Sequence, residues 1–137
     1  MKTIAIVNGA NLNLLGSREI DIYGTQSFES FFETLKMTYS HLQLIYFQSN
    51  KEEDLINFLH QHSNLDGIIL NPGAFSHTSL AIADAIRSIA APVIEVHISQ
   101  IFTREDFRKH SWITSACTGS ICGFGLNSYR LALEYFK

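Results

Sequence analysis

A segment near the start of the chain, residues 8–24, carries three asparagines, an arginine and a tyrosine between apolar positions. It is too long for an ordinary strand-to-helix connection of about 2–6 residues, and long loops in compact domains are usually functional. Arg18 could act on Tyr23, because a cation beside a phenol favours the phenolate and a phenolate can serve as a base. Composition alone leaves the alternative open, in which the asparagines make turns, Arg18 is solvated and the Tyr23 ring packs.

A second candidate, His97, follows an apolar run that ends at Val96. A histidine in a sheet is often a satisfied core residue, but at the end of a strand it can also meet a ligand. Ser99 and the backbone N–H groups beside it could hold a carboxylate, as turns and helix N-termini do. We therefore keep His97 and Ser99 as candidates for catalysis and binding.

Further candidates lie where we expect helices. His77 stands at the expected start of a helix, and Asp84 lies seven residues on, about two turns along the same face, where by itself it would be an ordinary solvated residue. Arg104 and Arg108 are four residues apart in an expected short helix. One of the two arginines could pair with a neighbouring acid while the other faces a ligand.

These side chains need a scaffold, and the apolar pattern predicts one. Five short apolar runs that favour β-strands alternate with segments of helical periodicity. This alternation predicts an α/β protein with a parallel sheet and helices on both faces. A flavodoxin-like order of five strands is the simplest arrangement for one domain of residues 1–137. The predicted strands are Thr3–Val7, Leu42–Phe47, Gly67–Leu70, Pro92–Val96 and Ser120–Phe124.

Local signals place the helices between these strands. Ser27 is a predicted N-cap, and Ser49 to Glu52 fits a capping box for the second helix. The third helix is expected to run from Leu80 until Pro92 stops it, and a short fourth one to begin near Thr103. A last amphipathic helix is predicted over residues 127–136.

The predicted strands end in amides, hydroxyls, a histidine and glycines, without a large basic residue directly there. Since ligands of open α/β sheets bind at these carboxyl ends, we expect a small ligand with hydroxyl groups or a carboxylate. Residues 8–24 contain neither the GxxxxGK[ST] phosphate loop nor the GxGxxG dinucleotide motif.

Composition excludes several classes of protein. The chain has 137 residues, 46% of them hydrophobic and 17% charged, and a net charge of -3, so we expect a globular protein that binds neither nucleic acid nor a membrane. No stretch reads as a signal peptide, which predicts a cytoplasmic location. Cys117 and Cys122 are expected to be reduced thiols, and the histidines do not form a metal motif.

Several long motifs make the chain similar to the type II 3-dehydroquinate dehydratases, or type II dehydroquinases, from Ile4 to Leu133. The motifs are NGANLNLLG at 8–16, followed by Arg18-Glu19 and Ile22-Tyr23-Gly24, FQSN at 47–50, NPGAFSHTS at 71–79, EVHIS at 95–99, REDFR at 104–108 and GFG at 123–125. The resemblance implies a lyase of the shikimate pathway to aromatic amino acids. It would convert 3-dehydroquinate to 3-dehydroshikimate by anti elimination through an enolate, with no metal and no cofactor.

The resemblance also implies roles for the candidates. Tyr23 would accept the proton beside the ketone with help from Arg18, Asn11 would stabilise the enolate oxygen, and His97 would protonate the departing hydroxyl. The substrate would be bound by Asn71, His77, Ile98, Ser99 and Arg108. Asp84 would come from a neighbouring subunit, because the family forms homododecamers built from trimers.

The chain departs from the family's usual pattern at several positions: Ala10 and Ile20 replace the usual prolines, Lys51-Glu52-Glu53 replaces His-Glu-Gly, and Gln100 replaces Asn. We expect the loss of the two prolines to loosen the segment from Leu14 to Gly24, which we interpret as a lid hinged at its glycines.

Two other functions are possible for a flavodoxin-like chain. A non-catalytic flavodoxin-like binding or signalling domain of the receiver type would need acidic residues where Asn8 ends the first strand. A flavin electron carrier would need hydroxyls in the segment 8–16, which holds no Ser or Thr.

Overall fold

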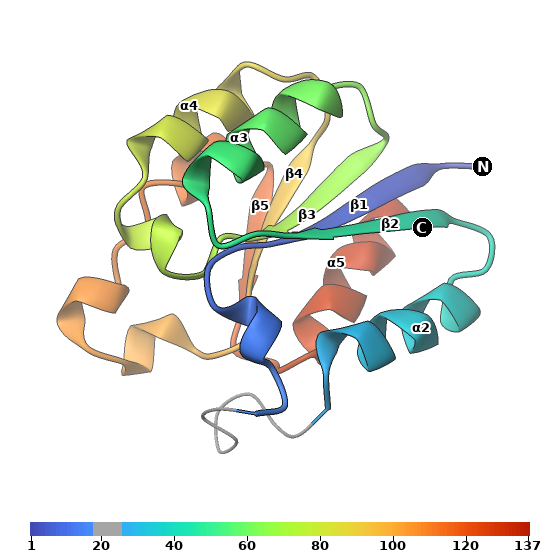
Figure 1. The fold of residues 1–137 in the computed structure, drawn as a ribbon, viewed down its shortest axis with the longest axis horizontal. Coiled ribbons are helices and arrows are strands. Elements are labelled where there is room, and N and C mark those ends of the chain that lie inside the picture. Colours follow the sequence, from blue (N-terminus) through green and yellow to red (C-terminus); the bar gives the residue numbers. More distant parts are fainter. Residues whose placement is uncertain (18–25) are drawn as a thin grey trace.

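The computed structural model describes residues 1–17 and 26–137 and contains a five-stranded parallel sheet (Figure 1). The strand order is β2-β1-β3-β4-β5, as in flavodoxin-like folds, so the predicted fold class is confirmed. The strands are β1 (Thr3–Asn8), β2 (Gln43–Gln48), β3 (Gly67–Asn71), β4 (Val93–His97) and β5 (Gly119–Cys122). Within the described ranges, no helix combines the length and the apolar character needed to span a bilayer.

Helices cover both faces of the sheet (Figure 1). On one face lie α2 (Phe28–Thr38) and α5 (Asn127–Phe136), and on the other lie α3 (Glu52–Gln61) and α4 (Leu80–Arg87). The interior strand β1 shows why: Ile4 and Ile6 pack into the core with α2 and α5, whereas Ala5 and Val7 pack with α3 and α4. Alternate side chains of a strand point to opposite faces, so a strand with two covered faces must be apolar throughout.

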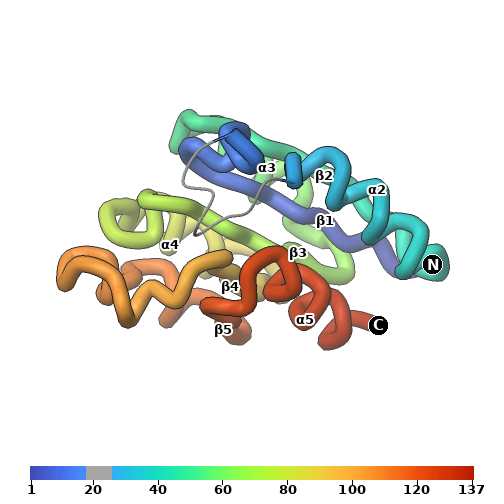
Figure 2. Tube along the Cα trace, turned by 90° about the horizontal axis from the view of Figure 1, so that it is seen from below, coloured from blue at the N-terminus to red at the C-terminus, as the bar shows by residue number. Residues whose placement is uncertain are grey.

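One glycine lets α5 close over the sheet. A Cβ atom on Gly67 would lie 2.3 Å from the ring of Phe136, so only glycine permits this contact at the start of β3. Lys2 also donates a hydrogen bond to the carbonyl of Phe136 (3.1 Å). The two chain ends consequently lie near each other, at the end of the sheet away from the polar strand termini (Figure 2).

The helix starts were only partly predicted. Ser27 caps α2 as expected, since its hydroxyl accepts the N–H of Ser30 at 3.2 Å. The capping box at Ser49 was wrong, because extended Lys51 is the N-cap of α3. The Ser49 hydroxyl instead accepts the Lys51 N–H (3.0 Å) and donates to Asp54 (2.6 Å), so it orders the turn before the helix.

The third helix is shorter than predicted. It begins after Ser79, which accepts the N–H of Ile82, and ends at Arg87, because the Ser88 hydroxyl bonds the carbonyl of Ala85 and competes with the helix. His77 belongs to a separate 3₁₀ helix, η2 (Gly73–His77). The expectation that His77 and Asp84 share one helix face was therefore wrong.

The predicted short fourth helix is also absent from the described chain. Two 3₁₀ helices, η3 (Ile101–Thr103) and η4 (Asp106–Arg108), take its place. Arg104 lies between them in extended conformation (φ -92°, ψ -168°), which interrupts any helical ladder. The two arginines are consequently not placed on one helix face.

Candidate active site

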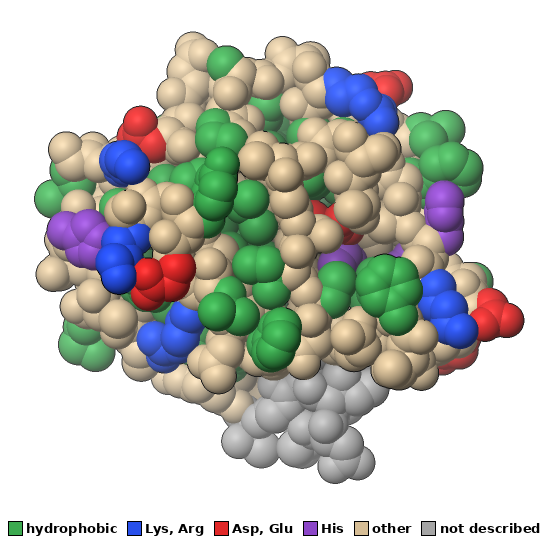
Figure 3. All heavy atoms as spheres, turned by 180° about the vertical axis from the view of Figure 1, so that it is seen from behind, with side chains coloured by type: hydrophobic (Ala, Val, Ile, Leu, Met, Phe, Trp, Pro, Cys, Tyr) green, Lys and Arg blue, Asp and Glu red, His purple; other side chains and the backbone are tan. Residues whose placement is uncertain are grey.

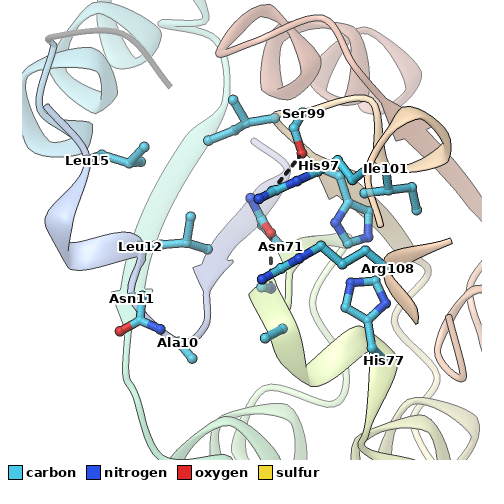
Figure 4. Close-up of a pocket in the computed structure, with 14 residues that line it drawn as sticks. Ala10, Asn11, Leu12, Leu15, Asn71, His77, His97, Ser99, Ile101 and Arg108 are labelled. Carbon is cyan, nitrogen blue, oxygen red and sulfur yellow. Dashed lines mark hydrogen bonds between the residues drawn. The ribbon is translucent and has the colours of Figure 1, made fainter. Parts of the chain in front are cut away.

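A pocket opens where β1, β3 and β4 end in polar side chains (Figure 4). Figure 4 shows Asn11 on one side of it, His77, His97 and Arg108 on the other, and Asn71 between them. The predicted site residues that line the pocket are Asn11, Asn71, His77, His97, Ile98, Ser99 and Arg108. The carboxyl edge of the sheet therefore gathers most of the candidates, as the strand pattern predicted.

Glycines bring the loops after β1 and β3 into contact beneath the pocket. The Gly9 N–H donates to the Asn71 carbonyl at 2.7 Å, and a Cβ on Gly9 would lie 2.4 Å from the carbonyl oxygen of Pro72. Gly73 has a φ of +62°, and a Cβ on it would lie 2.8 Å from the carbonyl oxygen of Ala10. A larger residue at either glycine would push these loops apart and shift the floor of the pocket.

Asn11 is held by its backbone rather than by its side chain. Its φ of 69° is left-handed, a conformation that asparagine tolerates better than most residues. The Asn11 N–H donates to the side-chain oxygen of Asn50 at 2.9 Å, and Gln48 donates to that same oxygen at 3.1 Å. Gln48 is the last residue of β2 and Asn50 follows the strand, so the end of β2 fixes the backbone at Asn11 while Asn11 lines the pocket.

His97 is paired with a buried acid on its own strand. Nε2 of His97 lies 2.7 Å from Oε2 of Glu95, and the two residues are 6% and 0% exposed. Residues two apart on a strand point to the same face, so β4 itself brings the pair together. Because Nε2 meets the carboxylate, Nδ1 is the ring nitrogen that can act on a ligand.

Two hydroxyls complete the surroundings of Glu95. Ser111 donates to Oε2 at 2.9 Å, and Thr114 donates to Oε1. Burial would raise the pKa of the Glu95 carboxyl, but the hydrogen bonds and charge of His97 with the two hydroxyl donors hold that pKa below its ordinary value. Glu95 is therefore an ionised carboxylate at neutral pH, and its bond to Nε2 orients the His97 ring.

His77 stands beside His97, with ring centroids 6.5 Å apart and nearly parallel planes. Its Nδ1 lies 2.6 Å from the backbone carbonyl of His110. A carbonyl can only accept, so Nδ1 of His77 must carry a proton and Nε2 is the atom able to meet a ligand.

The two arginines of the 101–108 region both line the pocket. Arg108 Nε pairs with Glu105 Oε2 at 2.9 Å, which is the acid pairing predicted for one of them. Arg104 donates to the Ser99 hydroxyl at 3.4 Å. The prediction that only the other arginine would face a ligand was therefore too simple, since pairing with an acid leaves Arg108 at the pocket wall.

The described pocket lining does not include Asp84, Arg18 or Tyr23. Asp84 lies on α4, with its side chain 80% exposed, in an ion pair with Arg87 at 3.4 Å. Arg18, Tyr23 and most of the expected lid lie outside the described residues.

Sequence reasoning missed three groups around the site, the carboxylate of Glu95 and the hydroxyls of Ser111 and Thr114. The signal for Glu95 was available, because an acid two residues before a histidine on a strand must share its face. Ser111 and Thr114 belong to a connection without periodicity, and nothing in their local sequence indicated Glu95 as a partner.

Other reactive groups offer no competing centre. Burial raises the pKa of Cys117 to about 12 and also raises that of Cys122, so both are protonated thiols at neutral pH. Over residues 1–17 and 26–137, no cluster of three or more His, Cys, Asp or Glu side chains could hold a metal ion. The polar side chains that line the described pocket are amide, imidazole, hydroxyl and guanidinium groups.

Comparison with known proteins agrees with this geometry. Residues 2–137 match the family model described as dehydroquinase class II. A 3-dehydroquinate dehydratase from Caldicellulosiruptor saccharolyticus is 50% identical over 141 residues, which cover 100% of this chain and 97% of the relative. A second, from Exiguobacterium, is 50% identical over 96% of this chain and 91% of its own.

Solved structures give the same picture. The type II dehydroquinase from Butyrivibrio crossotus superposes with a TM-score of 0.95 at 37% identity, covering 98% of this chain and 97% of that one. The type II dehydroquinase from Propionibacterium acnes gives 0.94 at 41% identity, with 98% and 95% covered.

Proposed function

The chain belongs to the class II dehydroquinase family, and on that basis we propose that it dehydrates 3-dehydroquinate to 3-dehydroshikimate. This reaction would be the third step of the shikimate pathway to chorismate and aromatic amino acids. The observation that carries the proposal is the Glu95–His97 pair at a pocket lined by amide, imidazole and guanidinium groups. Such a lining suits a cyclic ketone that bears hydroxyl groups and a carboxylate.

In the proposed mechanism, His97 is the general acid. The substrate loses a hydroxyl group, and a leaving hydroxide needs a proton at neutral pH. His97 would deliver that proton from Nδ1 while Nε2–H stays hydrogen-bonded to Glu95, whose negative charge stabilises the imidazolium before the transfer.

The proton acceptor would be Tyr23, which removes the hydrogen on the carbon beside the ketone. A phenol has an ordinary pKa of about 10, so it needs a neighbouring cation to ionise at neutral pH. Arg18 would supply that charge and stabilise the transition state. The electrons of the broken C–H bond pass to the ketone oxygen and form an enolate, which Asn11 would stabilise, and they return to expel the protonated hydroxyl.

Substrate binding would use the remaining groups of the pocket. Backbone N–H groups at Ile98 and Ser99 would hold the carboxylate, since amides in a turn make a concave site for anions. Asn71, His77 through Nε2, and Arg108 would bind the other oxygens. Every step is carried by side chains and backbone, and the proposal includes neither metal nor cofactor.

We propose a homododecamer built from trimers, in which Asp84 completes the site of a neighbouring subunit. Its exposed place on α4 supports this role. Apolar side chains that a free subunit leaves in solvent also support assembly, and Figure 3 shows such side chains on the face seen from behind. Large exposed apolar side chains of α4, η3, η4 and the segment after η4 are Leu80, Phe102, Phe107 and Trp112. A cytoplasmic location fits the proposed pathway.

The direct test mixes the purified protein with 3-dehydroquinate and follows the ultraviolet absorbance of the conjugated enone product. We expect the absorbance to grow at the same rate with a chelator, or with borohydride added to trap an imine. No growth would contradict the proposed activity, and loss of activity on chelation or reduction would contradict the proposed mechanism.

A further inference from the structure

Tyr129 joins the last helix to two strand ends at the pocket. It lies near the start of α5 and is fully buried, with 0% exposure. Its hydroxyl donates to Oδ1 of Asn8 at 2.7 Å and accepts a hydrogen bond from Nδ2 of Asn71 at 2.9 Å. Asn8 and Asn71 are the last residues of β1 and β3 and are direct partners in the register of the two strands.

A phenol hydroxyl has one proton, so it can donate to only one of the two asparagines. Tyr129 gives its proton to the carbonyl oxygen of Asn8, and Asn71 must therefore present its NH₂ group. The other polar atom of each side-chain amide also has a hydrogen-bond partner. Nδ2 of Asn8 faces the hydroxyl of Tyr46 at 3.5 Å, and Oδ1 of Asn71 accepts the N–H of Gly73 at 3.1 Å.

Aromatic packing fixes the position of the hydroxyl. The Tyr129 ring meets Phe28 edge-on, with centroids 4.9 Å apart, and Phe28 stacks on Tyr46 at 4.8 Å. Burial raises the pKa of Tyr46 to about 12, so its hydroxyl keeps its proton. Rings that interlock in this way leave little freedom to a hydroxyl at their edge.

We propose that Tyr129 is a positioning residue, which sets the rotation of the Asn71 amide and thereby the hydrogen bond that Asn71 makes to the substrate. This inference rests on the proposed function, because it gives Asn71 a ligand to bind. One N–H of the Asn71 amide donates to Tyr129, and Oδ1 accepts the N–H of Gly73. The second N–H of the amide is therefore the donor oriented toward the pocket. The last helix thus contributes to binding without touching the ligand.

The test compares Tyr129→Phe with Tyr39→Phe. Both substitutions remove one buried hydroxyl that links to another element, because Tyr39 bonds Glu134 on the same α5 at 2.9 Å. We expect Tyr129→Phe to lower kcat/KM about three- to tenfold, mainly through KM, which is the size of one ordinary hydrogen bond. We expect Tyr39→Phe and Tyr129→Phe to lower the melting temperature by similar amounts. Tyr39→Phe should leave kcat/KM unchanged.

A double-mutant cycle with Asn71→Ala separates positioning from a general structural effect. If Tyr129 acts through Asn71, its substitution has no further effect on kcat/KM once the amide is gone. Effects of the two substitutions that multiply would overturn the proposal, and so would unchanged kinetics of Tyr129→Phe.

A crystal structure of Tyr129→Phe provides a readout that does not depend on activity. We expect the Asn71 side chain to be rotated or to occupy two conformers, with the backbone of β3 unchanged. An Asn71 side chain in its original place would overturn the proposal even in an active enzyme. If the wild-type protein does not dehydrate 3-dehydroquinate, the proposed function fails, while the displaced amide would still be seen.

Discussion

The carboxylate of Glu95 lies 2.7 Å from Nε2 of His97, and both side chains are buried on one face of β4. A buried carboxylate is costly unless donors surround it, and here an imidazole and two hydroxyls do so. The pair therefore behaves as one unit, in which the carboxylate of Glu95 holds Nε2 of His97 and orients its ring.

Glu95→Gln should lower kcat by about 10–10³-fold, because an amide orients the ring but no longer stabilises the imidazolium. The measurement is kcat at saturating 3-dehydroquinate and neutral pH, with circular dichroism to check the fold. Glu134→Gln, which removes an exposed carboxylate from α5, is the control and should keep the wild-type kcat.

Thr114→Val should destabilise the protein by about 1–3 kcal/mol at neutral pH, because the buried Glu95 carboxylate loses one of its donors. In the folded wild type the pKa of Glu95 is lowered, so its ionisation stabilises the fold above its ordinary pKa of 4.5, and this stabilisation is lost as the pH falls through the folded value. The difference between variant and wild type should therefore shrink on acidification. Urea unfolding at pH 7 and pH 4 measures it, and a constant difference would contradict the assigned charge.

Asp84→Ala and His97→Ala should each be nearly inactive alone, if Asp84 acts in a neighbour's site. Subunits of the two variants, unfolded together and reassembled, should regain part of the activity, because some sites then combine an intact Asp84 with an intact His97. Each variant taken through the same procedure alone is the control. Mixed assemblies that stay inactive would contradict a shared site.

The layout of the fold and most of the pocket could be predicted because they depend on local patterns. Asn8, Asn71 and His97 directly follow apolar runs, and parallel strands bring their carboxyl ends to one edge. Ser27 could be predicted as a cap because its bond spans three residues.

What could not be predicted depends on contacts between distant residues. Tyr129 lies 121 residues from Asn8 in the sequence, and nothing in the pattern of the last helix indicates which strand its hydroxyl meets. The region around Arg104 has helical charge spacing, yet the extended backbone at this residue divides it into two 3₁₀ turns. Tertiary contacts therefore outweighed local periodicity at the edge of the pocket.

The central claim is that His97 gives the departing hydroxyl its proton, and the turnover of His97→Ala tests it most directly. We predict that kcat for 3-dehydroquinate falls by about 10²–10⁴-fold, the usual cost of losing a general acid, with circular dichroism and quaternary structure unchanged. A variant that folds and turns over at the wild-type rate would contradict the claim. A variant that only melts early, with normal kcat below its melting temperature, would show that His97 is a structural residue of the core.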